Sequence, residues 1–301
     1  MSIFDRLFGK KSAELTEAAP AAGAQPGEDE RPNKLSLQIL YGVKPSFGSA
    51  ELTERLRRYD PSMADGEAQI DPEGARTGTP FGRLSWGEHA VDLVGFDVPM
   101  PQRTCEMCIQ PAHYPEPVKQ QARAHVAHAL LYYAGSAADP YEQYIALAAA
   151  AGVLSEGAVV VMNEAGHTSL PVEVFALEDT DDRPAVLRSL PLPLIFVGMV
   201  KYNLPRDSRV WMRTHGAYLL GLPELAYWAS GHQEGQSTMD LYDSTLSYLL
   251  TSKAQVAPGH TLQVGSARYI KFRSPGKADP PSAPGERLLV VENIRPDSVN
   301  R

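Results

Sequence analysis

The sequence predicts an α+β protein, with a ferredoxin-like split β-α-β arrangement in its first half. Its second half is expected to form either a second α+β lobe or an extension of the first sheet. Two observations support this class: strand-like and helix-like periodicities alternate along the chain, and the stronger elements of the first half follow the order β-α-β-β-α-β-α-β. No period of roughly 20 to 50 residues recurs, which argues against a solenoid.

The first half contains the clearest elements. Residues 35–43 largely alternate apolar and polar side chains, as a half-buried strand does. A helix is expected over 49–58, because Ser49 is a suitable N-cap and two leucines follow it at helical spacing. By the same patterns we expect strands at 67–70, 81–86, 89–98, 126–133 and 158–163, and helices at 117–125 and 140–152.

The second half follows a polar, acidic segment at 177–188, which we interpret as a linker. Proline and glycine in residues 274–285 indicate a long hairpin loop, because the segment after it again has strand character. Around this loop we expect strands at 192–204, 261–272 and 287–294, and helices at 214–229 and 238–251.

The chain therefore divides into three predicted parts. Residues 1–33 form an amphipathic N-terminal peptide and a disordered linker, residues 34–177 the ferredoxin-like domain, and residues 190–301 a C-terminal α+β domain. Phe4, Leu7 and Phe8 lie on one helical stripe of the peptide, and are candidates for binding a protein or for weak peripheral membrane contact through residues 3–8. No apolar signal-peptide core is expected there.

Composition excludes several classes of protein. The 301 residues include 28 basic and 36 acidic side chains, a formal net charge of −8, which argues against a nucleic-acid binder. Two cysteines are too few for a disulfide scaffold. No apolar run approaches about 18 residues, so no transmembrane segment is expected, and we predict a cytoplasmic protein.

A resemblance to a known family rests on short motifs in the second half. A strand ending in Lys201-Tyr202-Asn203 is followed by Met212-Arg-Thr-His-Gly216, Gly221-Leu-Pro-Glu-Leu225 and Pro258-Gly-His-Thr-Leu262. This arrangement resembles the bacterial family known as domain of unknown function 4261, over roughly residues 192–272. The resemblance implies no established activity. Members of the family look like cytoplasmic bacterial proteins, and a link to toxin or secretion loci is suggested by analogy.

Thr214, His215 and Glu224 are the candidate catalytic residues. On a continuous helix Thr214 and Glu224 would fall within roughly 80° of each other, so that they could line a cleft with Glu224 as base or ligand. Pro223 disfavours such continuity and instead allows a new helix to begin there, with Glu224 in its first turn. The structural alternative is that the glycines permit close packing and that Glu224 complements a helix dipole.

The cysteines suggest a weaker, zinc-binding hypothesis. Cys105 and Cys108 form a CxxC, and His113 with His125 or His128 would complete four ligands. The second clean ligand pair of a zinc knuckle is missing, so we expect two ordinary thiols, no metal site and no cofactor.

Together these observations predict a non-enzymatic protein-binding module, of immunity or adaptor type, linked by analogy to a toxin or secretion system. Tyr218, Tyr227 and Trp228 are the expected binding aromatics, because such side chains dominate protein interfaces. The partner would be another protein, and homo-oligomers are compatible with the same surface. The alternative is a hydrolase or transferase with a Thr/His/Glu cleft, and a zinc-dependent variant is a third reading.

Overall fold

The computed structural model describes residues 35–77, 80–178, 180, 182–205, 207–265, 268–283 and 285–295. The predicted N-terminal peptide with Phe4, Leu7 and Phe8 lies outside these residues. The described chain divides into two compact units, the first ending at Leu190 and the second beginning at Pro191. Each unit has its own sheet accompanied by helices, which confirms the α+β class.

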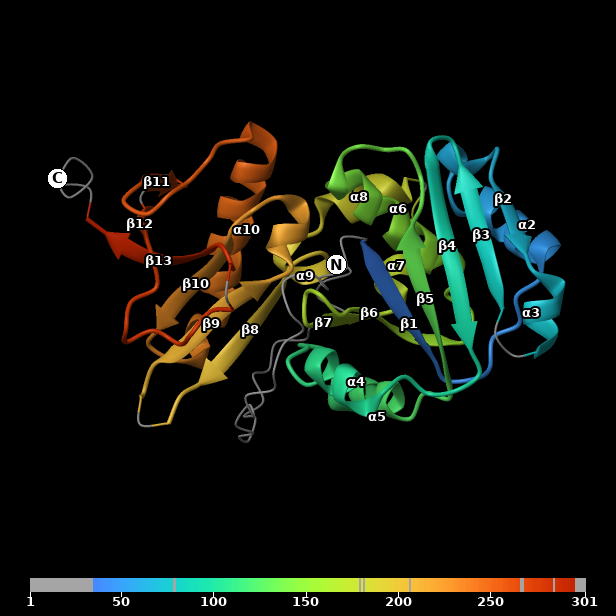
Figure 1. Cartoon of the computed structure of the whole chain (residues 1–301), viewed down its shortest axis with the longest axis horizontal. Coiled ribbons are helices and arrows are strands. Elements are labelled where there is room, and N and C mark those ends of the chain that lie inside the picture. Colours follow the sequence, from blue (N-terminus) through green and yellow to red (C-terminus); the bar gives the residue numbers. More distant parts are fainter. Residues whose placement is uncertain are drawn as a thin grey trace. The chain divides into compact units, whose positions relative to one another are not determined.

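The first unit is built on a seven-stranded sheet (Figure 1). Its elements are β1 (Ser36–Tyr41), α2 (Ser49–Tyr59), η2 (Pro61–Met63), β2 (Glu67–Ile70), α3 (Pro72–Thr77), β3 (Phe81–Trp86), β4 (His89–Phe96), α4 (Gln102–Ile109), α5 (Glu116–Arg123), β5 (Ala127–Tyr133), α6 (Pro140–Val153), β6 (Ala158–Asn163), β7 (Thr168–Pro171), α7 (Glu173–Ala176) and α8 (Arg183–Ser189). The strand order is β2-β3-β4-β5-β1-β6-β7, and the neighbours pair antiparallel. Helix α6 carries the chain from β5 to β6, which lie on either side of β1; the ferredoxin-like designation stays a prediction.

Helices cover both faces of this sheet because the central strands are apolar on both sides. Leu40, Val160 and Met162 pack with the side chains of α4 and α5 in one buried cluster. On the opposite face, the Tyr41 hydroxyl donates to the carbonyl of Leu154 at the end of α6. Successive residues of a strand point to opposite faces, so β1 uses alternate side chains for the two helical layers.

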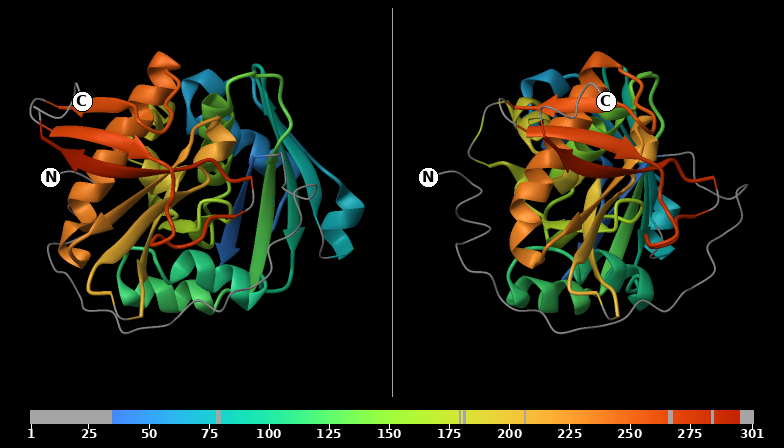
Figure 2. Two further views of the ribbon diagram at one scale, coloured as in Figure 1. Left: turned by 60° about the vertical axis from the view of Figure 1, so that its left-hand side comes forward. Right: turned by 90° about the vertical axis from the view of Figure 1, so that its left-hand side faces the viewer.

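The second unit is built on a six-stranded sheet. Its elements are α9 (Leu192–Ile195), β8 (Gly198–Asn203), β9 (Val210–His215), η3 (Ala217–Leu220), β10 (Glu224–Ala229), η4 (His232–Glu234), α10 (Gly235–Ser252), β11 (Thr261–Val264), β12 (Arg268–Arg273) and β13 (Leu288–Ile294). The order is β11-β12-β13-β10-β9-β8; β10 pairs parallel with β13, and the other neighbours pair antiparallel. Figure 2 shows α10, in orange, alongside these strands, where the Tyr242 hydroxyl donates to the Met212 carbonyl at 2.8 Å.

The predicted helix over 214–229 is wrong. The segment instead ends β9, forms the short η3 turn and begins β10, so that β9 and β10 pair antiparallel. Gly216 and Gly221 flank η3 with φ values of 89° and 72°, a left-handed conformation that interrupts a helix and that glycine adopts readily. The aromatic pair Tyr227-Trp228 suits the strand that follows.

Three other boundaries differ from the predictions. The strand expected over 261–272 is the β11–β12 hairpin, which turns near Gly265 at a φ of 64°. The strand expected over 192–204 begins as the short helix α9, and the segment interpreted as a linker at 177–188 contains most of α8. The long loop before β13 is confirmed, because β12 and β13 pair antiparallel on either side of it.

Candidate functional site

Thr214 and Glu224 form a buried hydrogen-bonded pair between β9 and β10. The Thr214 hydroxyl donates to Glu224 Oε2 at 2.6 Å, and its Oγ1 accepts the Leu225 backbone N–H at 2.8 Å. Thr214 is fully buried, and 2% of the surface of Glu224 is exposed. Because β9 and β10 pair, residues ten positions apart in the sequence meet across the strands. The pair thus joins β9 to β10 through a buried hydrogen bond between side chains.

The environment of Glu224 disfavours its charged form. Burial raises the pKa of this carboxyl, while the hydrogen bond from Thr214 and the positive charge of Arg213 act in the opposite direction. Its second oxygen, Oε1, accepts the backbone N–H of Tyr218 at 3.4 Å, which connects it to η3. Both carboxyl oxygens therefore have protein partners, as expected for a buried polar group.

His215 and Arg213 make separate contacts. His215 Nε2 lies 2.9 Å from the Tyr202 hydroxyl on β8. The Arg213 guanidinium forms an ion pair with Glu286, in the segment before β13. Of the predicted trio, Thr214 and Glu224 therefore bond to each other, whereas the His215 ring contacts Tyr202 on β8.

The three expected binding aromatics do not form one surface. Tyr227 and Trp228 are consecutive in β10 and point to opposite faces of the sheet. Tyr227 packs with Val210, whereas Trp228 contacts Trp211 and donates from Nε1 to Asp279 at 2.8 Å. Both are partly buried, and Tyr218 is the exposed one, at 41%.

The cysteines lie in the core of the first unit. Cys105 and Cys108 are on α4, free and buried, and their thiols lie near the carbonyls of Met100 and Asn163. Burial raises the pKa of the Cys105 thiol to about 11 and that of Cys108 further, which disfavours the thiolate that a metal or a redox reaction needs. His113, the third predicted ligand, lies exposed in the segment between α4 and α5.

The two histidines before and within β5 hold the segment that follows β4. His125 Nε2 accepts the Met100 N–H at 2.8 Å, and its Nδ1 lies 2.7 Å from the Ala122 carbonyl. His128 Nδ1 lies 2.8 Å from the Val98 carbonyl. Burial lowers the pKa of both rings, which favours neutral imidazoles in these contacts.

Within the described ranges, no group of three or more His, Cys, Asp or Glu side chains is arranged to hold a metal ion. None of the helices in the described part of the chain has the length and apolar character of a membrane span.

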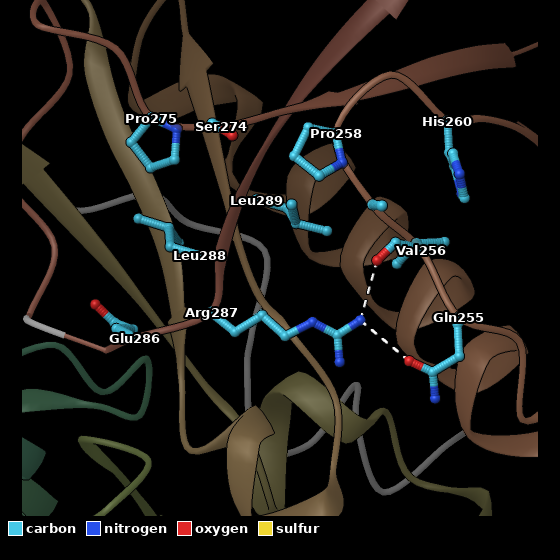
Figure 3. A pocket seen from close by; sticks show the side chains of 11 residues that line it. Gln255, Val256, Pro258, His260, Ser274, Pro275, Glu286, Arg287, Leu288 and Leu289 are labelled. Atoms are coloured by element: carbon cyan, nitrogen blue, oxygen red, sulfur yellow. Dashed lines mark hydrogen bonds between the residues drawn. The ribbon is translucent and has the colours of Figure 1, made fainter.

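A groove lies beside the loop that connects α10 to β11. Its larger part has a volume of about 540 Å³ and is shown in Figure 3; its smaller part has a volume of about 390 Å³. The two parts share Gln255, Val256 and His260, so both border residues 254–260. The apolar lining of the larger part consists of Val256, Ala257, Pro258, Pro275, Leu288 and Leu289.

The groove contains functional candidates that sequence reasoning missed. Tyr248 lines the smaller part from α10 and is 48% exposed. Arg287 lines the larger part, and its Nη2 donates to the Val256 carbonyl at 3.0 Å and to Gln255 Oε1 at 3.3 Å, as Figure 3 shows. The available signal for Tyr248 was an aromatic side chain outside the apolar stripe of a predicted helix; nothing local pointed to Arg287.

Comparison with the curated proteins found no match, and neither did comparison with the solved structures. One protein-family model matches, and it covers the segment from the end of β9 to the residue before β13. This segment contains the Thr214–Glu224 pair and most of the groove lining. Residues 213–287 thus match the family described as Domain of unknown function (DUF4261), which confirms the resemblance predicted for the second half of the chain.

Proposed function

We propose that this chain is a non-enzymatic protein-binding module whose second unit binds its partner in the groove around residues 254–260. The observation that carries the proposal is the groove itself, which combines apolar walls with an exposed tyrosine, Tyr248, and an oriented arginine, Arg287. Tyrosine and arginine are among the side chains most enriched at the residues that contribute most of the binding free energy of protein interfaces.

The burial of Thr214 and Glu224 supports binding over the hydrolase or transferase alternative. A general base must lie within hydrogen-bond reach of a substrate proton. Here the Glu224 carboxyl accepts from Thr214 and from the Tyr218 backbone, and 2% of the residue is exposed. These contacts favour a structural role for the pair.

The wider setting is also part of the proposal. We place the module in the cytoplasm, which is supported by two cysteines that are free in the structure. An immunity or adaptor role, in which an acidic chain binds a partner protein or a second copy of itself, fits the net charge of −8.

Site-specific photo-crosslinking in native cells tests the proposal. A benzophenone amino acid replaces Tyr248 in the full chain, and a matched chain carries it at Phe81, which is 51% exposed on β3 of the first unit. We expect one polypeptide to be crosslinked from position 248 and not from position 81, and a Val256→Asp substitution to abolish that product. No product from position 248, or the same products from both positions, would overturn the proposal.

A further inference from the structure

The charged side chains of the groove are unevenly balanced. Arg287 lines the larger part and Lys271 the smaller part. The groove-lining carboxylate is Glu286, which is ion-paired with Arg213 and accepts the Ala283 N–H. The groove therefore presents cationic groups without a free carboxylate of its own, although the whole chain is acidic.

The Arg287 guanidinium is oriented by hydrogen bonds that use only part of its N–H groups. Gln255 Oε1 and the Val256 carbonyl both accept hydrogen bonds from its Nη2. An arginine side chain carries five N–H donors, and those on Nε and Nη1 have no partner among the described residues. An arginine that is already oriented loses less conformational entropy when it binds an anion.

Lys271 is also available for a ligand. It lies on β12, and no ion pair joins it to another described residue. The carboxylate opposite it on β13, Glu292, is bound by Arg273. Glu292 thus forms its ion pair with Arg273 and not with the Lys271 ammonium.

We infer that the groove binds an acidic peptide segment of a partner protein, whose carboxylates are received by Arg287 and Lys271 and whose apolar side chains lie against the walls of the groove. This inference rests on the proposed function and names the chemistry of the partner. Charge complementarity selects carboxylates, since hydrogen bonds between a guanidinium and a carboxylate are among the strongest in proteins. The walls formed by Val256, Pro258 and Leu289 supply the apolar contact.

Peptide titration of the full chain tests the inference. The probes are three pools of acetylated, fluorescein-labelled octapeptides with apolar residues at alternate positions and glutamate, glutamine or lysine at the others. Fluorescence anisotropy is expected to show the glutamate pool binding at least about tenfold more tightly than the glutamine pool, with affinity falling as NaCl is added. The lysine pool is expected to bind most weakly.

Variants locate the binding. Arg287→Ala and Lys271→Ala should each weaken binding of the glutamate pool by about tenfold, whereas Lys277→Ala, an exposed lysine outside the groove lining, should leave it unchanged. The double variant Arg287→Glu with Lys271→Glu should prefer the lysine pool, which separates a change of charge from a failure to fold.

Equal binding of the glutamate and glutamine pools would overturn the inference and leave the proposed function intact. Failure of all three pools, or an unchanged affinity in both alanine variants, would also overturn it. Crosslinking from position 248 decides the proposed function independently of these outcomes.

Discussion

The Thr214 hydroxyl donates a 2.6 Å hydrogen bond to the Glu224 carboxyl across the β9–β10 hairpin, and the same oxygen accepts the Leu225 N–H. One side chain therefore satisfies a buried carboxyl and a backbone donor together. Removing it takes away the partner of Glu224 Oε2 and that of the Leu225 N–H, while Glu224 Oε1 keeps the Tyr218 N–H, and buried polar atoms that lose a partner destabilise a fold.

We predict that Thr214→Val lowers the free energy of unfolding by about 1–3 kcal/mol, because valine has a similar shape but lacks the hydroxyl. Denaturant unfolding followed by tryptophan fluorescence measures this. Thr214→Ser keeps the hydroxyl and should retain more of the stability than valine does. Equal stabilities of the valine variant and the parent would show that the hydrogen bonds contribute nothing net.

Glu224 should make stability fall as pH rises. Burial raises its pKa in the folded protein above the unfolded value of about 4.3, so folding favours the protonated carboxyl. Its contribution is complete below about pH 4.3 and is lost as pH rises through the folded-state pKa. Unfolding titrations between about pH 4 and pH 8 should show a flatter profile for Glu224→Gln than for the parent; parallel profiles would contradict the assignment.

His125 should have the opposite dependence on pH. Its Nε2 accepts the Met100 N–H, and burial lowers its pKa, so the folded state favours the neutral ring. The stabilisation is present above the unfolded pKa of about 6.5 and is lost as pH falls below it. His125→Gln retains an acceptor and should reduce the acid-side slope of the unfolding free energy by a fraction of one proton. An identical slope in the variant would rule out His125 as the titrating group.

Gly152 is expected to tolerate no side chain. A Cβ at this position in α6 would clash with the Phe175 carbonyl and lie 2.6 Å from the Tyr59 hydroxyl. Because Tyr59 itself donates to that carbonyl at 2.6 Å, neither group can easily move away. Gly152→Ala should lower the unfolding free energy by about 1–3 kcal/mol or more.

Gly48→Ala is the matched control for Gly152→Ala, since a Cβ there meets no atom within 4 Å. Thermal unfolding should show a larger loss for position 152 than for position 48, which is the N-cap of α2 and where alanine should cost about 1 kcal/mol or less. Similar losses at the two positions would mean that packing around α6 is not the cause.

The candidate site was only partly predictable from local patterns. The motif drew attention to Thr214 and Glu224, and Pro223 argued against one continuous helix between them. The helical geometry assumed for them was wrong, because local periodicity does not show that β9 and β10 pair. The aromatics were found, but Tyr227 and Trp228 separate onto opposite faces once their segment is a strand.

The sequence alone was sufficient for the alternation of helices and strands, for the long loop before β13 and for the family resemblance of the second half. These features depend on side-chain periodicity, turn residues and short motifs, which are local properties. The groove and the buried pair required the tertiary structure. Arg287 meets Val256 only because β13 and the end of α10 converge, and Thr214 meets Glu224 only through strand register. Both depend on contacts between distant residues, whose free energy comes from burial and hydrogen bonding across the fold.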